Sequence, residues 1–176
     1  MAKFISAAGS HCHLSSGDIF RGILPETPLG EIFHKYSSKG LLLPDELTIN
    51  IFKLYLLGLV HTNVFQPTKQ TLILDGLPRT LSQARLLDAH INVKGIILLE
   101  VEDLELLVNR IRRRSMIEKR PDDREQAILK KRLHLFKNET LKVLDHYDLR
   151  VIHAVNAQQR PLEVLRDILI KFASII

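Results

Sequence analysis

The chain has 176 residues, of which 45% are hydrophobic and 26% are charged, so it is long and apolar enough to form one globular domain with a substantial core. Its formal net charge is +5, and the single cysteine, Cys12, excludes a disulfide framework and indicates a reducing compartment, which we take to be the cytoplasm. No run of 18 apolar residues is present, so the sequence predicts no membrane-spanning helix and no membrane partner.

Strands alternate with helices along the chain, which predicts an α/β fold with helices on both faces of a parallel sheet. In chain order we expect a helix over 2–9, a strand over 11–14, helices near 18–23, 29–38 and 45–58, a strand over 71–75, a helix over 80–89, a strand over 94–101, helices over 103–116 and 123–146, a strand over 151–155 and a helix over 161–173. The helices between residues 18 and 58 would form a small inserted lobe.

The segment over residues 71–79, which reads Thr-Leu-Ile-Leu-Asp-Gly-Leu-Pro-Arg, is the most informative one. Its first four residues are apolar or β-prone without alternation, which suits a strand that is buried on both faces of a parallel sheet. Ligands of open α/β sheets bind just beyond the carboxyl ends of the strands. Asp75 could therefore hold a metal or water, and Arg79 a phosphate. Taken alone, the segment is equally typical of a strand, a turn and a helix start with two solvated charges.

A second motif favours the ligand-binding interpretation. Residues 14–21 read Leu-Ser-Ser-Gly-Asp-Ile-Phe-Arg, and together with the Asp-Gly-Leu-Pro-Arg-Thr run from Asp75 and with Gln83 they resemble the adenylate kinase family. Further segments resemble motifs of that family in the same order, namely residues 40–47, 110–114, 120–123, 131–133 and 155–157. The resemblance spans residues 2 to about 170, and it is the ordered set of motifs that makes it specific.

The resemblance implies a single domain over 1–176, a three-layer parallel sheet of the P-loop nucleotide kinase type, with a monophosphate-binding lobe over 15–44 and a short lid over 113–123. It implies reversible phosphoryl transfer between ATP and AMP, with Mg²⁺ bound to ATP, giving two ADP. The implied AMP-binding residues are Ser16, Arg21, Leu41, Leu42, Leu43, Gly76, Arg79, Gln83, Arg120 and Arg132. The implied ATP-binding residues are Arg110, Arg114 and Gln159. The implied catalytic residues are Arg79, Arg114, Arg120, Arg132 and Asp75, and Asp75 would hold the metal through water.

The residue types at these positions suit that chemistry. Phosphoryl transfer needs positioning and charge neutralisation, which the planar donor forks of arginine supply. Arg110 and Arg114 are four residues apart and share a helix face, where Arg110 would stack on the donor adenine. The amide of Gln83 can pair with the N6/N1 edge of adenine, and Ser16 also favours AMP over pyrimidine monophosphates.

One feature of the family is missing from the sequence. A phosphate-binding loop reads Gly-x-x-x-x-Gly-Lys-Ser/Thr, whereas the only such glycine spacing here, Gly17 to Gly22, is followed by Ile23 and Leu24. We therefore expect the first strand and its loop to be missing, through a wrongly assigned start, a truncated chain or a decayed gene. The expected results are weak AMP binding, little or no turnover, and marginal stability or an edge-paired oligomer in place of the family's monomer.

Two further departures affect the lid and the arginine that follows it. One extra residue before Leu133 leaves either Lys131 or Arg132 at the family's arginine position, and we favour Arg132. Residues 115–119 are too few for a four-cysteine zinc lid, and a single cysteine excludes structural zinc there. The eight histidines show no ligand spacing, so we expect His11 and His13 to be an ordinary surface pair.

Three other functions remain open at this point. One is a kinase selective for UMP or CMP, against which Ser16 and Gln83 argue. Another is a catalytically silent nucleotide-binding or scaffold relative. The third is a nucleic-acid binder, since residues 110–132 hold ten Lys/Arg against four Asp/Glu. No aromatic residue interleaves this basic segment, however, so we expect no nucleic-acid partner.

Overall fold

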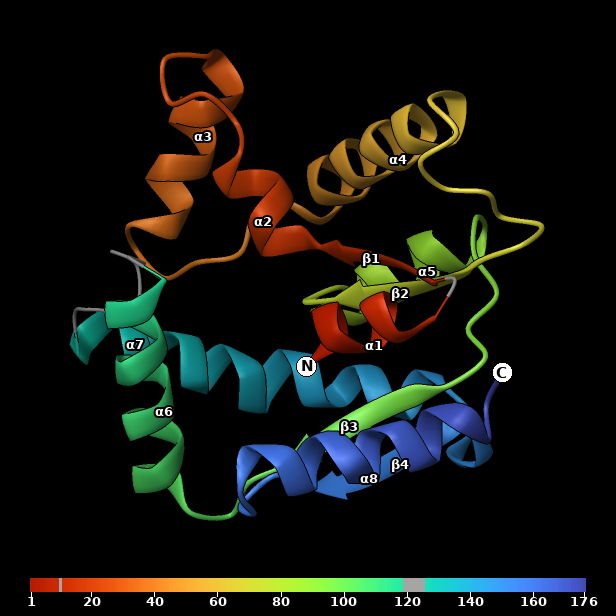
Figure 1. The fold of residues 1–176 in the computed structure, drawn as a ribbon. Coiled ribbons are helices and arrows are strands. Elements are labelled where there is room, and N and C mark those ends of the chain that lie inside the picture. Colours follow the sequence, from red (N-terminus) through yellow and green to blue (C-terminus); the bar gives the residue numbers. More distant parts are fainter. Residues whose placement is uncertain (10, 119–125) are drawn as a thin grey trace. The chain divides into compact units, whose positions relative to one another are not determined.

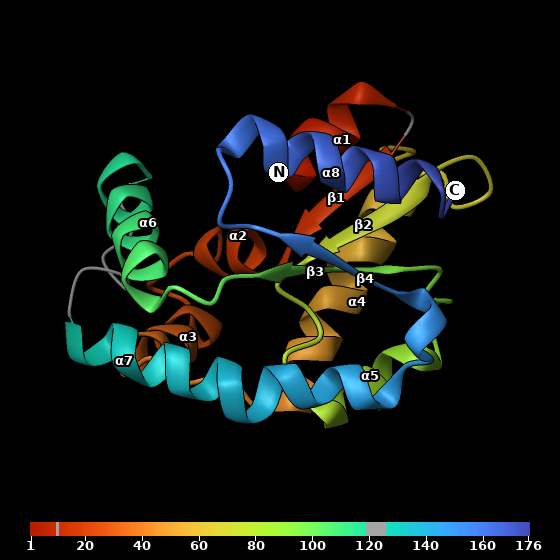
Figure 2. The same cartoon turned by 90° about the horizontal axis from the view of Figure 1, so that it is seen from below.

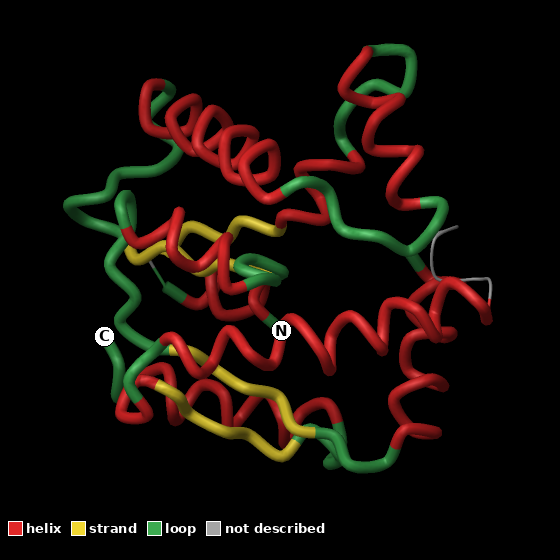
Figure 3. The backbone as a smooth tube through the Cα atoms, turned by 180° about the vertical axis from the view of Figure 1, so that it is seen from behind, coloured by secondary structure: helices red, strands yellow, loops and turns green. Residues whose placement is uncertain are grey.

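The computed structural model describes residues 1–9, 11–118 and 126–176 (Figure 1). The chain divides into two compact units. Unit 1 comprises Met1–Ser37 and Leu42–Ile91, and unit 2 comprises Ser38–Leu41 and Asn92–Ile176. Each unit contains one pair of parallel strands, and the yellow strands in Figure 3 show both pairs.

Unit 1 is built on strands β1 (His11–Ser15) and β2 (Thr71–Asp75), which pair in register from His11 opposite Thr71 to Ser15 opposite Asp75. Figure 2 shows the two strands side by side. The helices of this unit are α1 (Ala2–Ala8), α2 (Ser16–Arg21), α3 (Pro28–Ser37), α4 (Asp45–His61) and α5 (Leu81–Asp88). Because β1 and β2 are parallel, their carboxyl ends lie at the same edge of the pair. A helix start follows β1 and a turn follows β2 at this edge.

The hydrophobic core of unit 1 lies between α4, α5 and the strand pair. Its buried members are Leu14, Ile49, Phe52, Leu77 and Leu87. Phe52 is 2% exposed and Leu87 is 0% exposed. Burying an aliphatic or aromatic side chain of this size stabilises a fold by about 1.5–3 kcal/mol. Since Leu14 precedes α2 and Leu77 follows β2, the same core fixes both segments that carry the predicted acceptor site.

Unit 2 is built on strands β3 (Ile96–Glu100) and β4 (Ile152–Asn156), which are also parallel. Its helical segments are α6 (Leu104–Ile117), α7 (Gln126–Leu135), the π-helix η2 (Phe136–Thr140), the 3-10 helices η3 (Leu141–His146) and η4 (Leu149–Val151), and α8 (Pro161–Ala173). Asp103 caps α6, because its carboxylate accepts hydrogen bonds from the N–H groups of Glu105 and Leu106. Among the described residues, no helix is both long enough and apolar enough to cross a bilayer.

The predicted α/β class and the parallel strand pairing are confirmed. The sheet itself is divided, as expected if the central first strand is missing: the four described strands form the pairs β1–β2 and β3–β4, and each has one hydrogen-bonded neighbour among the described residues. The bounds and type of one helix differ from the prediction. The helix predicted over 123–146 is described from Gln126 and changes to π and then 3-10 hydrogen bonding after Leu135.

Candidate functional site

The turn after β2 brings three of the predicted AMP-binding residues into contact. The carbonyl of Gly76 accepts a hydrogen bond from the Ser16 hydroxyl at 2.8 Å and from Arg79 Nε at 2.8 Å. Gly76 has a φ of +77°, and a Cβ there would lie 2.9 Å from both Ser16 Oγ and Arg79 Nη2. Glycine is favoured at this position, because a side chain would strain the backbone at this positive φ and would displace the two polar groups beside it.

Gln83 connects this turn to the start of α4. Its Oε1 accepts a hydrogen bond from the backbone N–H of Arg79 at 2.8 Å, and its Nε2 donates to Asp45 Oδ1 at 2.8 Å. Gln83 is 2% exposed, so both bonds are shielded from water. The amide predicted to contact adenine thus has two partners within the chain. Sequence reasoning missed Asp45, which lies 38 residues away from Gln83 along the chain.

Arg21, the predicted α-phosphate ligand, lies at the end of α2 and folds back onto that helix. Its Nη2 donates to Asp18 Oδ1 at 2.5 Å, and a Cβ on Gly17 would lie 2.9 Å from Arg21 Nη1. Burial works to raise the pKa of Asp18, but the Arg21 hydrogen bond and the charges of Lys3 and Arg21 hold that pKa below its usual value. A phosphate on Arg21 would therefore compete with a carboxylate that is ionised at neutral pH.

Asp75 ends β2 with a side chain that is 62% exposed. Its Oδ2 lies 3.8 Å from Nε2 of His13, which is a buried atom without a hydrogen-bond partner among the described residues. His13 is 10% exposed and is therefore not the surface residue predicted from the sequence. An exposed carboxylate suits a hydrated Mg²⁺, which keeps most of its waters. In the described part of the chain, no cluster of three or more His, Cys, Asp or Glu side chains could hold a metal ion directly.

Two predicted ATP-binding residues meet at the turn after β4. Arg110, on α6, donates from Nη2 to the carbonyl of Gln159 at 2.8 Å and from Nη1 to the carbonyl of Ala157. The Gln159 amide donates in turn to Asp167 Oδ2 at 2.6 Å and to the Asn156 carbonyl at 3.0 Å. This network lies at the carboxyl end of a parallel strand, as does the cluster around Gly76 in unit 1.

The remaining predicted arginines have different environments. Arg114 is half-buried on α6, whereas Arg112 and Arg113 are exposed. Arg132 is half-buried on α7 and Lys131 is exposed. Arg120 lies outside the described residues, as does the lid segment over 119–123.

The leucines of the predicted AMP site are divided between the two units. Leu42 and Leu43 belong to unit 1, where Leu43 is 8% exposed. Leu41 belongs to unit 2 and is 45% exposed. The structure therefore groups Ser16, Gly76, Arg79 and Gln83 in unit 1, and separately groups Arg110 and Gln159 in unit 2.

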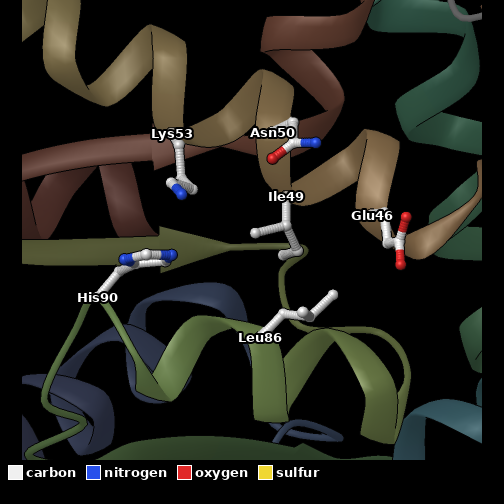
Figure 4. Close-up of a pocket in the computed structure, with 6 residues that line it drawn as sticks. All are labelled: Glu46, Ile49, Asn50, Lys53, Leu86 and His90. Carbon is white, nitrogen blue, oxygen red and sulfur yellow. The ribbon is translucent and has the colours of Figure 1, made fainter.

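A shallow hollow of about 220 Å³ lies between α4 and α5 in unit 1 (Figure 4). It is lined by Glu46, Ile49, Asn50, Lys53, Leu86 and His90. None of these residues belongs to the predicted nucleotide sites, so the hollow does not support their assignment.

Comparison with known proteins identifies related sequences. The family model described as adenylate kinase matches residues 1–152. The adenylate kinase of Flavobacterium psychrophilum is 33% identical over 162 residues, covering 88% of this chain and 81% of that protein. The adenylate kinase of Thermus thermophilus is 34% identical over 158 residues, covering 86% and 77%. The adenylate kinase of Mesoplasma florum is 32% identical over 192 residues, covering 89% and 85%.

Proposed function

This chain belongs to the adenylate kinase family of nucleoside monophosphate kinases, and we propose that it transfers a phosphoryl group between ATP and AMP to give two ADP. The observation that carries the proposal is the hydrogen-bonded cluster of Ser16, Gly76, Arg79 and Gln83 at the carboxyl ends of β1 and β2. It combines a guanidinium group suited to phosphate with a carboxamide suited to a purine edge. These are the two ends of a nucleoside monophosphate.

In the proposed acceptor site, Arg79 and Arg21 hold the AMP phosphate and Gln83 contacts the adenine. Residues 15–44 form the lobe around the monophosphate, with Ser16 and the segment 41–43 beside the base. Nε of Arg79 is fixed on the Gly76 carbonyl, so the guanidinium is oriented before the ligand arrives. Preorganisation of this kind reduces the entropy lost on binding.

In the proposed donor site, Arg110 and Gln159 bind ATP, and Arg114, Arg120 and Arg132 surround the transferred phosphoryl group under a lid over 113–123. Each such arginine contributes on the order of 10²–10³ to the rate, by analogy with single electrostatic donors. Asp75 would hold Mg²⁺ through water, and the ion would neutralise charge on the phosphates. We also propose a cytoplasmic location, which the single cysteine supports. The chain would be either a monomer or an edge-paired oligomer.

The acceptor assignment predicts a preference for AMP over pyrimidine monophosphates. We expect the chain to bind AMP at least about tenfold more tightly than UMP or CMP, because a pyrimidine lacks the adenine edge that the Gln83 amide matches. Isothermal titration with the three nucleotides measures this preference. Equal or tighter binding of UMP or CMP would favour a pyrimidine monophosphate kinase instead.

The donor side leads to a separate prediction about turnover. Residues 1–176 contain no Gly-x-x-x-x-Gly-Lys-Ser/Thr segment, so a polypeptide of these residues lacks that cradle for the ATP phosphates. We expect it to form ADP from ATP and AMP slowly or not at all, while it still binds AMP weakly. A coupled assay of ADP formation with the purified polypeptide tests this, and rapid ADP formation would contradict it.

A further inference from the structure

The orientation of the buried Gln83 amide is fixed by its two partners. The carboxylate of Asp45 can only accept a hydrogen bond and the backbone N–H of Arg79 can only donate one, so Nε2 faces Asp45 and Oε1 faces Arg79. Turning the amide over would place oxygen against carboxylate and NH₂ against N–H. The two hydrogen bonds, both 2.8 Å long, therefore favour one of the two orientations.

Each polar atom of this amide keeps one further hydrogen-bonding position. Oε1 has a second lone pair and Nε2 has a second hydrogen. Adenine offers an amino donor at N6 and an acceptor at N1, whereas hypoxanthine and guanine offer an acceptor at O6 and a donor at N1. An amide free to turn over could match either edge by exchanging its oxygen and nitrogen. A fixed amide matches only one of them.

We propose that Asp45 is a positioning residue that sets the base specificity of the acceptor site, by holding the Gln83 amide in the orientation that matches adenine and opposes a 6-oxopurine. This role rests on the proposed function, in which Gln83 contacts the base. It assigns to the first residue of α4 a part in nucleotide recognition through another side chain. Since Gln83 is 2% exposed, contact between the base and the amide requires local movement of neighbouring side chains, and side-chain changes on binding are common.

The position of Asp45 at the start of α4 allows its role to be tested against a neighbouring carboxylate. Asp45 is half-buried and starts α4, where a carboxylate also complements the helix dipole. Glu46 is the next residue, carries the same charge in the same helical turn and is exposed. Gln83 donates to Asp45 and not to Glu46, so Glu46 provides a matched control for the loss of charge at this helix end.

The test compares AMP with IMP, which carries the 6-oxopurine hypoxanthine, in the parent chain and three variants. We expect Asp45→Ala to lower the ratio of the IMP Kd to the AMP Kd by about tenfold, because only the Arg79 N–H then orients the amide. Asp45→Asn retains an acceptor oxygen and is expected to keep the parent ratio. Glu46→Ala is expected to keep it as well. Isothermal titration supplies both constants, and thermal unfolding confirms that each variant is folded.

A second measurement tests directly whether the Gln83 amide is held in place. The Gln83 side-chain NH₂ protons, assigned by NMR, should exchange slowly with solvent, and they should exchange faster in Asp45→Ala. Rapid exchange in the parent chain, or an unchanged AMP-to-IMP preference in folded Asp45→Ala, would overturn the role of Asp45 while leaving AMP binding intact. Failure of the parent chain to bind AMP would instead overturn the proposed function, and the role of Asp45 with it.

Discussion

Replacing Arg79 with alanine is expected to raise the Kd for AMP by about 10- to 100-fold, the usual effect of losing a hydrogen bond to a charged group. The structure gives the reason for a large effect. The Arg79 side chain donates to the Gly76 carbonyl and its backbone N–H donates to Gln83, so hydrogen bonds within the chain position the guanidinium. Isothermal titration of the parent chain and Arg79→Ala with AMP measures the loss.

Two controls separate a phosphate contact from a structural effect. Adenosine lacks the phosphate, so its affinity should be nearly the same in the parent chain and in Arg79→Ala. Arg85, exposed on α5, carries the same charge on the segment that follows, and Arg85→Ala should bind AMP like the parent chain. Equal losses of AMP and adenosine affinity in Arg79→Ala would mean that the residue maintains the turn and does not bind the phosphate.

Replacing Phe52 with alanine is expected to lower the free energy of unfolding by about 3–5 kcal/mol, the range for truncating a buried aromatic side chain. Phe52 is 2% exposed and packs with Leu14, Ile49, Leu77 and Leu87. A loss of this size is a large fraction of the 5–15 kcal/mol by which typical domains are stable. Because Leu14 and Leu77 adjoin the site segments, AMP binding should weaken as well.

Leu54 provides the matched control for this prediction. It lies on the same helix, α4, but is 71% exposed, so Leu54→Ala should change the unfolding free energy by no more than about 0.5 kcal/mol. Urea denaturation followed by circular dichroism gives both values. Similar small losses in the two variants would show that the core of unit 1 does not depend on Phe52.

The sequence predicts the elements best where periodicity and end signals agree. The unbroken apolar run before Asp75 predicts the strand over 71–75, and the helix predicted over 161–173 has the same bounds in the structure. The predicted helix over 123–146 shows the limit of such reasoning. Its apolar spacing suits any helix, whereas the change to π and 3-10 hydrogen bonding depends on backbone bonds that the residue types do not reveal.

The candidate site is predictable in its residues but not in their partners. The motifs place Ser16, Arg79 and Gln83 after strands, and the structure brings these three together. Asp45 escapes prediction because an acidic residue in the first helical turn is already explained by the helix dipole. The burial of His13 escapes it too, since alternate histidines around a strand suggest solvent contact as readily as a covered face.

The segment Ser38–Leu41 belongs to unit 2, although the residues on both sides of it belong to unit 1. Gly40, with a φ of +68°, lies so close to α7 that a Cβ there would be 3.1 Å from the Ile128 carbonyl oxygen. Bringing residues this far apart in sequence together costs an unfolded chain roughly 4 kcal/mol of loop-closure entropy. If residues 42–91 fold first, the loop that separates Gly40 from Ile128 becomes effectively shorter. We therefore expect the contact between Gly40 and α7 to form late. A fragment over 92–176 would lack the segment Ser38–Leu41, which belongs to the same unit.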